Sequence, residues 1–398
     1  VICMDSTYKT NKYKMPLFEL IGVTPTNMNF LVGYAILMDE SYSSYLWVME
    51  KLRDLLLGTV SPTAIITDRE LGLMRPLREV FPDSAHLLCT WHINKDVLNY
   101  AYHVFGKNKQ MAETLRRGRW RKIMLSTSEA EYDRALYALK DLYRSWPAIT
   151  EYLDTTWLVH KEKFVLNWTN KVLHFGNTTN CRVESAHSAL KEWISTSTAA
   201  LDTLFERVNA AIEMQLTNIR NFLEDSSRRN LTNFGHPLYR HINGRVSHHC
   251  LQLLSQEVKR MQQLDDEVEY RCGCAFLTTH GIPCACTIRG CLESDNGIYL
   301  EQIHPFWRTL VIGEGAGNAD FVSQAAQDAE HFRSLVDEIA GSDPSVIRSA
   351  SRILFEQLHP EHSNLREPAE KTKLRGRPRG KSTRQDPSAF EYAERGSG

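Results

Sequence analysis

The sequence has no long hydrophobic run and almost no net charge. Its longest strongly apolar stretch, Phe30 to Met38, is far too short to cross a bilayer as a helix, and no signal-peptide pattern opens the chain. The 47 basic and 48 acidic residues leave a net charge of -1, so any surface that binds a polyanion must be local. We therefore expect a soluble protein with no membrane partner. Its 398 residues, 42% of them hydrophobic, suffice for two to three domains.

The cysteines are spread unevenly along the chain. Four of the nine cysteines lie between Cys272 and Cys286, which is typical of a metal cluster and not of a secreted disulfide framework. A reducing compartment is therefore expected. Nucleotide-binding glycine loops are also missing, because no strand precedes Gly380-Lys381-Ser382 and its first glycine is misplaced.

Two short apolar segments end on an acid. Val1 to Met4 leads into Asp5, and the β-branched run Ala64 to Thr67 leads into Asp68. The chain begins inside the first of these predicted strands, so we expect further residues upstream of Val1. Carboxylates at two strand ends predict a magnesium site, because Mg²⁺ prefers hard oxygen ligands. A third acid would complete a two-metal centre for phosphoryl transfer.

The order of predicted elements indicates an α/β fold. Three strands come first, as an antiparallel meander that ends near Met38. A helix at about 43–57 and a strand at 64–67 follow. A second helix at about 70–80, a short strand at 85–89 and a further helix complete the order. By analogy, this is the order of the ribonuclease H-like fold, in which a mixed sheet gathers its acids at one edge.

The rest of the chain is predicted to be mostly helical. Between Met111 and Trp168 aromatic and leucine residues recur at helical spacing, which favours an all-helical insertion with an aromatic core over base-stacking platforms. Later helices are expected from Cys181, at Leu201 to Leu223, at Cys250 to Leu264 and within Ala319 to Leu358. The expected divisions are a first part of the α/β core (1–110), the insertion (111–175), helices with the third acid (176–265), a cysteine-rich finger (266–295), a helical region (296–365) and a disordered basic tail (366–398).

Four stretches resemble motifs of one family. They are Met4-Asp5-Ser6-Thr7-Tyr8-Lys9-Thr10-Asn11, Ile66-Thr67-Asp68, Leu88-Cys89-Thr90-Trp91-His92 and Thr179-Asn180-Cys181-Arg182-Val183-Glu184-Ser185. On these residues the chain resembles the Mutator-like element (MULE) transposases of eukaryotes over roughly residues 1 to 310. The resemblance implies a catalytic triad of Asp5, Asp68 and Glu184 that holds two Mg²⁺ or Mn²⁺ ions. One ion would activate water or a DNA 3′-hydroxyl, and the other would stabilise the leaving oxygen.

Each of these assignments has a plainer alternative. An acid near a helix N-terminus complements the helix dipole, and Glu192 lies on the same predicted helix, but the Asn-x-x-x-Glu-Ser context favours Glu184. Cys89 and His92 match the CxxH motif of the family, which implies a role near the active site. Two residues do not make a zinc site, and Cys89 is equally well explained by packing. His187 is a proton shuttle or phosphate contact in one interpretation and a surface histidine in the other.

The cysteine cluster predicts zinc. Cys272, Cys274, Cys284 and Cys286 form two CxC pairs nine residues apart, and four thiolates suit tetrahedral Zn²⁺. The segment resembles a SWIM-type zinc finger in which Cys286 replaces the final histidine. His280 and Cys291 are therefore alternatives for the fourth ligand.

The tail carries seven basic residues and no acid between Lys371 and Arg384. Arg375-Gly376-Arg377-Pro378-Arg379 resembles an AT-hook, whose arginines enter the narrow minor groove of A·T-rich DNA. A solvated tail or a nuclear-localisation run is compatible with it.

Together these features lead us to expect a nuclear DDE transposase, oligomeric on double-stranded DNA, that cuts transposon ends and joins them to a target. Basic residues of the helical insertion are candidate contacts to DNA phosphates: Arg116, Arg117, Arg119, Arg121 and Lys122. They are equally well explained as a solvated helix face. One alternative is a non-enzymatic DNA-binding regulator descended from such a transposase, like the plant light-signalling transcription factors with this domain order. A zinc-dependent protein scaffold is the other.

Overall fold

The structure is a computed structural model that describes residues 1–56, 61–106, 108–194, 199–263, 274–294, 296–312 and 332–358. The chain divides into two compact units, and the boundary lies after Leu310. In the second unit, residues 332–340 and α16 (Pro344–Leu358) are helical, inside the helical stretch predicted from Ala319. The predicted AT-hook, Arg375 to Arg379, and the remainder of the basic tail lie outside the described residues.

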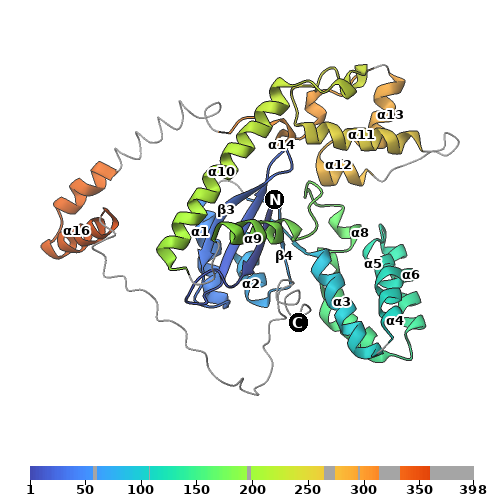
Figure 1. Cartoon of the computed structure of the whole chain (residues 1–398), viewed down its shortest axis with the longest axis horizontal. Helices are drawn as coiled ribbons and strands as arrows, with labels where there is room; N and C mark the ends of the chain where they lie inside the picture. The colour runs from blue at the N-terminus through green and yellow to red at the C-terminus, as the bar shows by residue number, and fades with distance from the viewer. Residues whose placement is uncertain are drawn as a thin grey trace. The chain divides into compact units, whose positions relative to one another are not determined.

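A five-stranded mixed sheet forms the centre of the first unit (Figure 1). The strands are β1 (Ile2–Thr7), β2 (Leu17–Val23), β3 (Asn29–Ile36), β4 (Ala64–Thr67) and β5 (Ala85–Leu88). Their order is β3-β2-β1-β4-β5, with β2 antiparallel to both of its neighbours and β4 and β5 parallel to β1. The predicted α/β class with a mixed sheet is confirmed.

Helices cover both faces of the sheet because its strands carry apolar residues on both sides. Met4 and Ile65 point to the face covered by α1 (Tyr42–Leu55) and α2 (Leu71–Val80). Cys3 and Ile66, each one position away, pack with Val183 of α9 (Cys181–Ile194) on the other face (Figure 1). Successive residues of a strand alternate between faces, so Asp5 follows Cys3 on the side of α9.

The segment after β5 is helical and has its own core. Its elements are α3 (Thr90–Phe105), α4 (Lys109–Thr114), the π-helix η1 (Leu115–Trp120), α5 (Arg121–Met124), α6 (Glu129–Leu142), α7 (Pro147–Tyr152), η2 (Leu153–Trp157), η3 (Leu158–Lys163) and α8 (Leu166–Thr169). Trp120, Tyr143 and Phe164 are fully buried there, and Leu88 of β5 belongs to the same cluster. These aromatics therefore pack the core of the insertion and fasten it to the sheet.

The last part of the first unit is a second helical assembly. It comprises α10 (Leu201–Arg228), η4 (Thr232–Phe234), η5 (Pro237–Tyr239), α11 (His248–Gln262), α12 (Ala275–His280), α13 (Ala285–Glu293), η6 (Leu300–Gln302) and α14 (Pro305–Arg308). A core that includes Cys250, Ile282 and Trp307 holds α11 and α13 together. None of the helices in the described parts of the chain is both long enough and apolar enough to span a membrane.

Candidate functional site

The two aspartates lie toward the edge where β1 and β4 end: Asp5 is in the second half of β1, and Asp68 directly follows β4. The parallel register pairs Ile2 with Ile65 and Cys3 with Ile66, so it continues to Asp5 opposite Asp68. Asp5 is 8% exposed, and its Oδ1 accepts a hydrogen bond from the Ser6 amide at 2.8 Å. Burial holds the pKa of Asp5 well above its usual range, and the charges of Asp68 and Glu184 raise it further. Burial also raises the pKa of Asp68.

Glu184 completes this group from the first turn of α9. Asn180, immediately before the helix, is fully buried, and its Nδ2 donates to the carbonyl of Met4 at 3.0 Å. The amide of Asn180 donates to Sγ of Cys89, also at 3.0 Å. These two contacts fix the start of α9 against β1 and β5. As a result Glu184 lies close enough to raise the pKa of Asp5.

The CxxH motif holds this arrangement in place. Cys89 is buried, and burial raises its pKa to about 12, so a protonated thiol accepts the Asn180 hydrogen bond. Nε2 of His92 lies 3.3 Å from Oε1 of Glu184. Burial lowers the pKa of His92 to about 4, so a neutral ring faces the carboxylate at pH 7. Neither residue belongs to a group of three closely spaced metal-ligating side chains in the described part of the chain, and by the same 4.8 Å spacing neither do the three acids.

The expectation that His187 lies on the surface is wrong. It is 4% exposed and shares the sheet-facing side of α9 with Val183 and Leu190. Burial lowers its pKa to about 3, and it hydrogen-bonds the backbone of Asp5. Residues three and four apart share one helix face, so Val183 and His187 face the sheet together, whereas Glu192 is exposed. The structure thus brings Glu184, and not Glu192, to the aspartates.

Glu19 is a site residue that the sequence pattern did not single out. It lies on β2 directly opposite Asp5 and is 1% exposed. Burial raises its pKa to about 8, although Lys191 acts in the opposite direction. The signal was a single acid inside the apolar strand 17–23, a position where a charge is costly. A fourth carboxyl group therefore lies on the strand next to that of Asp5.

The cysteine cluster forms a second candidate site. The sulfur atoms of Cys274, Cys284 and Cys286 lie within 4.8 Å of one another, while Cys272 lies outside the described residues. Zn–S bonds of about 2.3 Å put tetrahedral sulfurs ~3.8 Å apart, so three thiolates at this spacing suit one Zn²⁺ ion. Cys291 is not a member of this described group.

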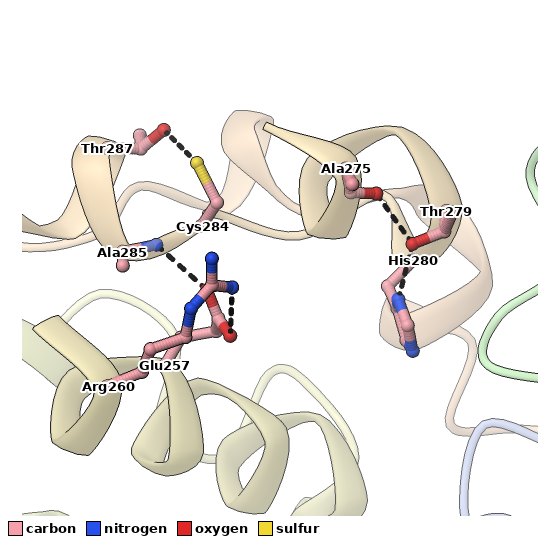
Figure 2. Close-up of polar contacts among 8 residues, drawn as sticks. All are labelled: Glu257, Arg260, Ala275, Thr279, His280, Cys284, Ala285 and Thr287. Carbon is pink, nitrogen blue, oxygen red and sulfur yellow. Dashed lines mark hydrogen bonds and ion pairs between the residues drawn. The ribbon is translucent and has the colours of Figure 1, made fainter. Parts of the chain in front are cut away.

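His280, the other alternative ligand, points away from the cluster. Figure 2 shows its ring at the far end of α12 from Cys284, with Nδ1 hydrogen-bonded to Oγ1 of Thr279 at 2.8 Å. The same figure shows how the start of α13 is held. The buried Glu257 accepts from the amide of Ala285 at 2.9 Å and pairs with Arg260 at 3.2 Å. This contact joins α11 to α13, the helix that begins between Cys284 and Cys286.

Comparison with known proteins identifies the class of the α/β part. Residues 1–96 match the MULE transposase domain. This stretch contains β1 to β5, both aspartates and the CxxH motif. The chain therefore carries a MULE transposase domain, in agreement with the family resemblance of its motifs.

Curated relatives extend the similarity further along the chain. Protein FAR-RED IMPAIRED RESPONSE 1 of Arabidopsis thaliana is 26% identical over 201 residues, which cover 49% of this chain and 22% of that protein. Protein FAR1-RELATED SEQUENCE 5 of the same plant is 25% identical over 222 residues, 54% of this chain and 26% of that protein. The PKS-NRPS hybrid synthetase cheA of Chaetomium globosum is 34% identical over 101 residues. This match covers 24% of this chain but only 2% of the synthetase. The chain spans about a quarter or less of the length of these relatives.

Proposed function

We propose that this chain is part of a transposase-derived DNA-binding regulator that acts in the nucleus on double-stranded DNA. The observation that carries the proposal is the similarity to the two Arabidopsis proteins over about half of the chain, together with the MULE transposase domain. The first of these relatives is named for an impaired response to far-red light, which fits a regulatory role. Assembly as a homo-oligomer on DNA is part of the proposal.

The arrangement of strands and cysteines supports the rest of the proposed organisation. The strand order β3-β2-β1-β4-β5, with acids where β1 and β4 end, supports a ribonuclease H-like scaffold. Cys272, Cys274, Cys284 and Cys286 would hold one structural Zn²⁺ in a SWIM-type finger. The described sulfur positions suit such an ion. Arg375 to Arg379 would add minor-groove contacts to A·T-rich DNA.

The assembled acids favour a second candidate function, metal-dependent strand cleavage and transfer. Asp5, Asp68 and Glu184 would hold two Mg²⁺ or Mn²⁺ ions, since carboxylates are the ligands that these ions prefer. Burial, and for Asp5 and Asp68 neighbouring acids, raise the pKa values of these carboxyls, and a bound cation would favour their charged forms. Two such ions activate an attacking hydroxyl and stabilise the leaving oxygen. In this proposal Cys89 positions Glu184 through Asn180, His92 faces Glu184 directly, and neither touches the substrate.

One set of assays separates these candidates. The parent chain and its Asp68→Asn variant are tested for salt-dependent duplex binding, and for cleavage and strand transfer on pre-nicked DNA with Mn²⁺. A regulator binds DNA with an affinity that falls steeply with salt and cuts in neither form. If the chain is a transposase, the parent cuts the DNA and the Asp68→Asn variant does not. Absence of salt-sensitive binding would contradict both and leave a zinc-dependent protein scaffold. The same assay on a chain extended upstream of Val1 tests whether added N-terminal residues change the activity.

A further inference from the structure

A cavity of about 550 Å³ lies between β5 and the helical segment that follows it, where α3, η1, α5, η3 and α8 line it. We call it the basic pocket, because its lining includes Arg116, Arg117, Arg121 and Lys163 and no acidic residue. Its volume is within the ~300–1,000 Å³ range of small-molecule sites. It is separate from the three carboxylates, none of which lines it.

The positive charge of this pocket is only partly compensated. Arg116 and Arg117 share one carboxylate, that of Glu113, each at 2.8 Å. Arg121 makes no ion pair within the described part of the chain. Lys163 donates to a backbone carbonyl at 3.3 Å, where burial and a neighbouring arginine lower its pKa. Four cations thus face a cavity in which low-dielectric walls strengthen their field.

A π-helix concentrates these cations. Residues 116 and 121 would be separated by about 140° around the axis of an α-helix with 3.6 residues per turn. Because η1 covers Leu115–Trp120 with i→i+5 bonding, this segment turns less per residue, and both arginines line the same cavity. The Nε of Arg116 is buried and meets no acceptor among the described residues.

The remaining wall is apolar and close to the candidate active site. Leu88, Met124 and Phe164 line the pocket. Thr90 and Thr178 line it as well, and both the amide and the hydroxyl of Thr90 donate to the carbonyl of Thr178 at 3.2 Å. Thr178 lies two residues before Asn180, so the pocket shares a wall with the segment that positions Glu184. A ligand here needs an anionic part for the arginines and a flat or apolar part for the other side.

We propose that the basic pocket binds a nucleoside phosphate, with the phosphate at Arg116 and Arg121 and the base against the apolar wall. Two sources supply this chemistry: an extrahelical nucleotide of a bound DNA strand, or a free nucleotide. The first source rests on the proposed DNA-binding function, and the second does not.

The test compares two matched arginine variants of the full chain. Arg121→Ala removes a pocket cation, whereas Arg119→Ala removes a nearby arginine that does not line the basic pocket. Fluorescence anisotropy measures binding to a duplex with one unpaired adenine and to the same duplex fully paired. The parent should prefer the bulged duplex about tenfold or more, in line with a charged hydrogen-bonded contact. Arg121→Ala should lose that preference, and Arg119→Ala should keep it. Circular dichroism checks that both variants are folded.

A second arm uses deoxyadenosine monophosphate and inorganic phosphate in calorimetric titrations. Mononucleotide binding that depends on Arg121 but not on Arg119, without any preference for the bulge, supports the pocket with a free nucleotide as its source. Equal affinity for both duplexes together with no mononucleotide binding would overturn the proposal. Equal effects of the two substitutions would overturn it too, and so would inorganic phosphate binding as tightly as the mononucleotide. If the parent binds no duplex at all, the proposed function fails, while the mononucleotide arm still decides the pocket.

Discussion

Replacing Asn180 with alanine should loosen the contact that places the third acid. Its side chain is fully buried, and Nδ2 donates to the Met4 carbonyl at 3.0 Å. Losing this bond leaves a buried carbonyl without its partner, which costs about 1–3 kcal/mol. Oδ1 of Asn180 is itself buried without a partner among the described residues, so its removal offsets part of that loss. We expect the free energy of unfolding to fall by about 1–2 kcal/mol.

Urea denaturation followed by tryptophan fluorescence measures this change, and Asn167→Ala provides the matched control. Asn167 is also buried, but its Nδ2 donates to no acceptor in the described part of the chain. The control should therefore lose less stability than Asn180→Ala. The stabilisation by Mn²⁺ should also shrink in Asn180→Ala alone, because only that change frees the start of α9. If Asn167→Ala proves to be the more destabilising substitution, the proposed role of Asn180 is wrong.

Two further predictions concern titration and zinc. Burial raises the pKa of Glu19 from 4.5 to about 8, so its folded state binds the proton more tightly and stability falls as pH rises through that range. Buried histidines, whose pKa is 6.5 when unfolded, add a stability that rises with pH near that value, but they do so equally in Glu19→Gln. The metal-free urea midpoint of the parent relative to that of Glu19→Gln should therefore fall between pH 6.5 and 8. Zinc released by a thiol reagent should approach one ion per chain and be lost in Cys284→Ser. Cys250→Ser, at a buried cysteine outside the cluster, should retain it; equal zinc contents in the two variants would contradict the assignment.

The strands and the aspartates were predictable because their signals are local. A β-branched run such as Ala64–Thr67 has few alternatives to a buried strand, and an acid directly after it lies at the sheet edge. The start of α9 at Cys181 was equally readable, because the turn-forming residues before it do not continue a helix. Such features depend on a few neighbouring residues and not on the rest of the fold.

Other features depend on tertiary packing, which the sequence pattern does not specify. The burial of His187 follows from which side of α9 packs on the sheet, and a histidine fits either side of an amphipathic helix. The sequence of Leu115–Trp120 does not by itself distinguish a π-helix from an α-helix, so the convergence of Arg116 and Arg121 was not visible. His280 and Cys291 have suitable spacing for a zinc ligand, but α12 carries the His280 ring away from Cys284, and Cys291 does not belong to the described group of sulfurs.

The raised pKa values of the acids lead to a last prediction, which concerns Asp5→Asn. Burial and the charges of Asp68 and Glu184 raise the pKa of Asp5, so ionising it in the metal-free protein costs stability. An amide of the same shape still accepts the Ser6 hydrogen bond and removes that cost. Without divalent ions at pH 8, Asp5→Asn should be more stable than the parent by about 1 kcal/mol or more, since one pKa unit corresponds to about 1.4 kcal/mol. Saturating Mn²⁺ should reverse the order, because a bound ion stabilises only the parent, by RT ln(1 + [L]/Kd). An Asp5→Asn variant that is less stable than the parent in both conditions would show that these carboxylates are structural and not a cation site.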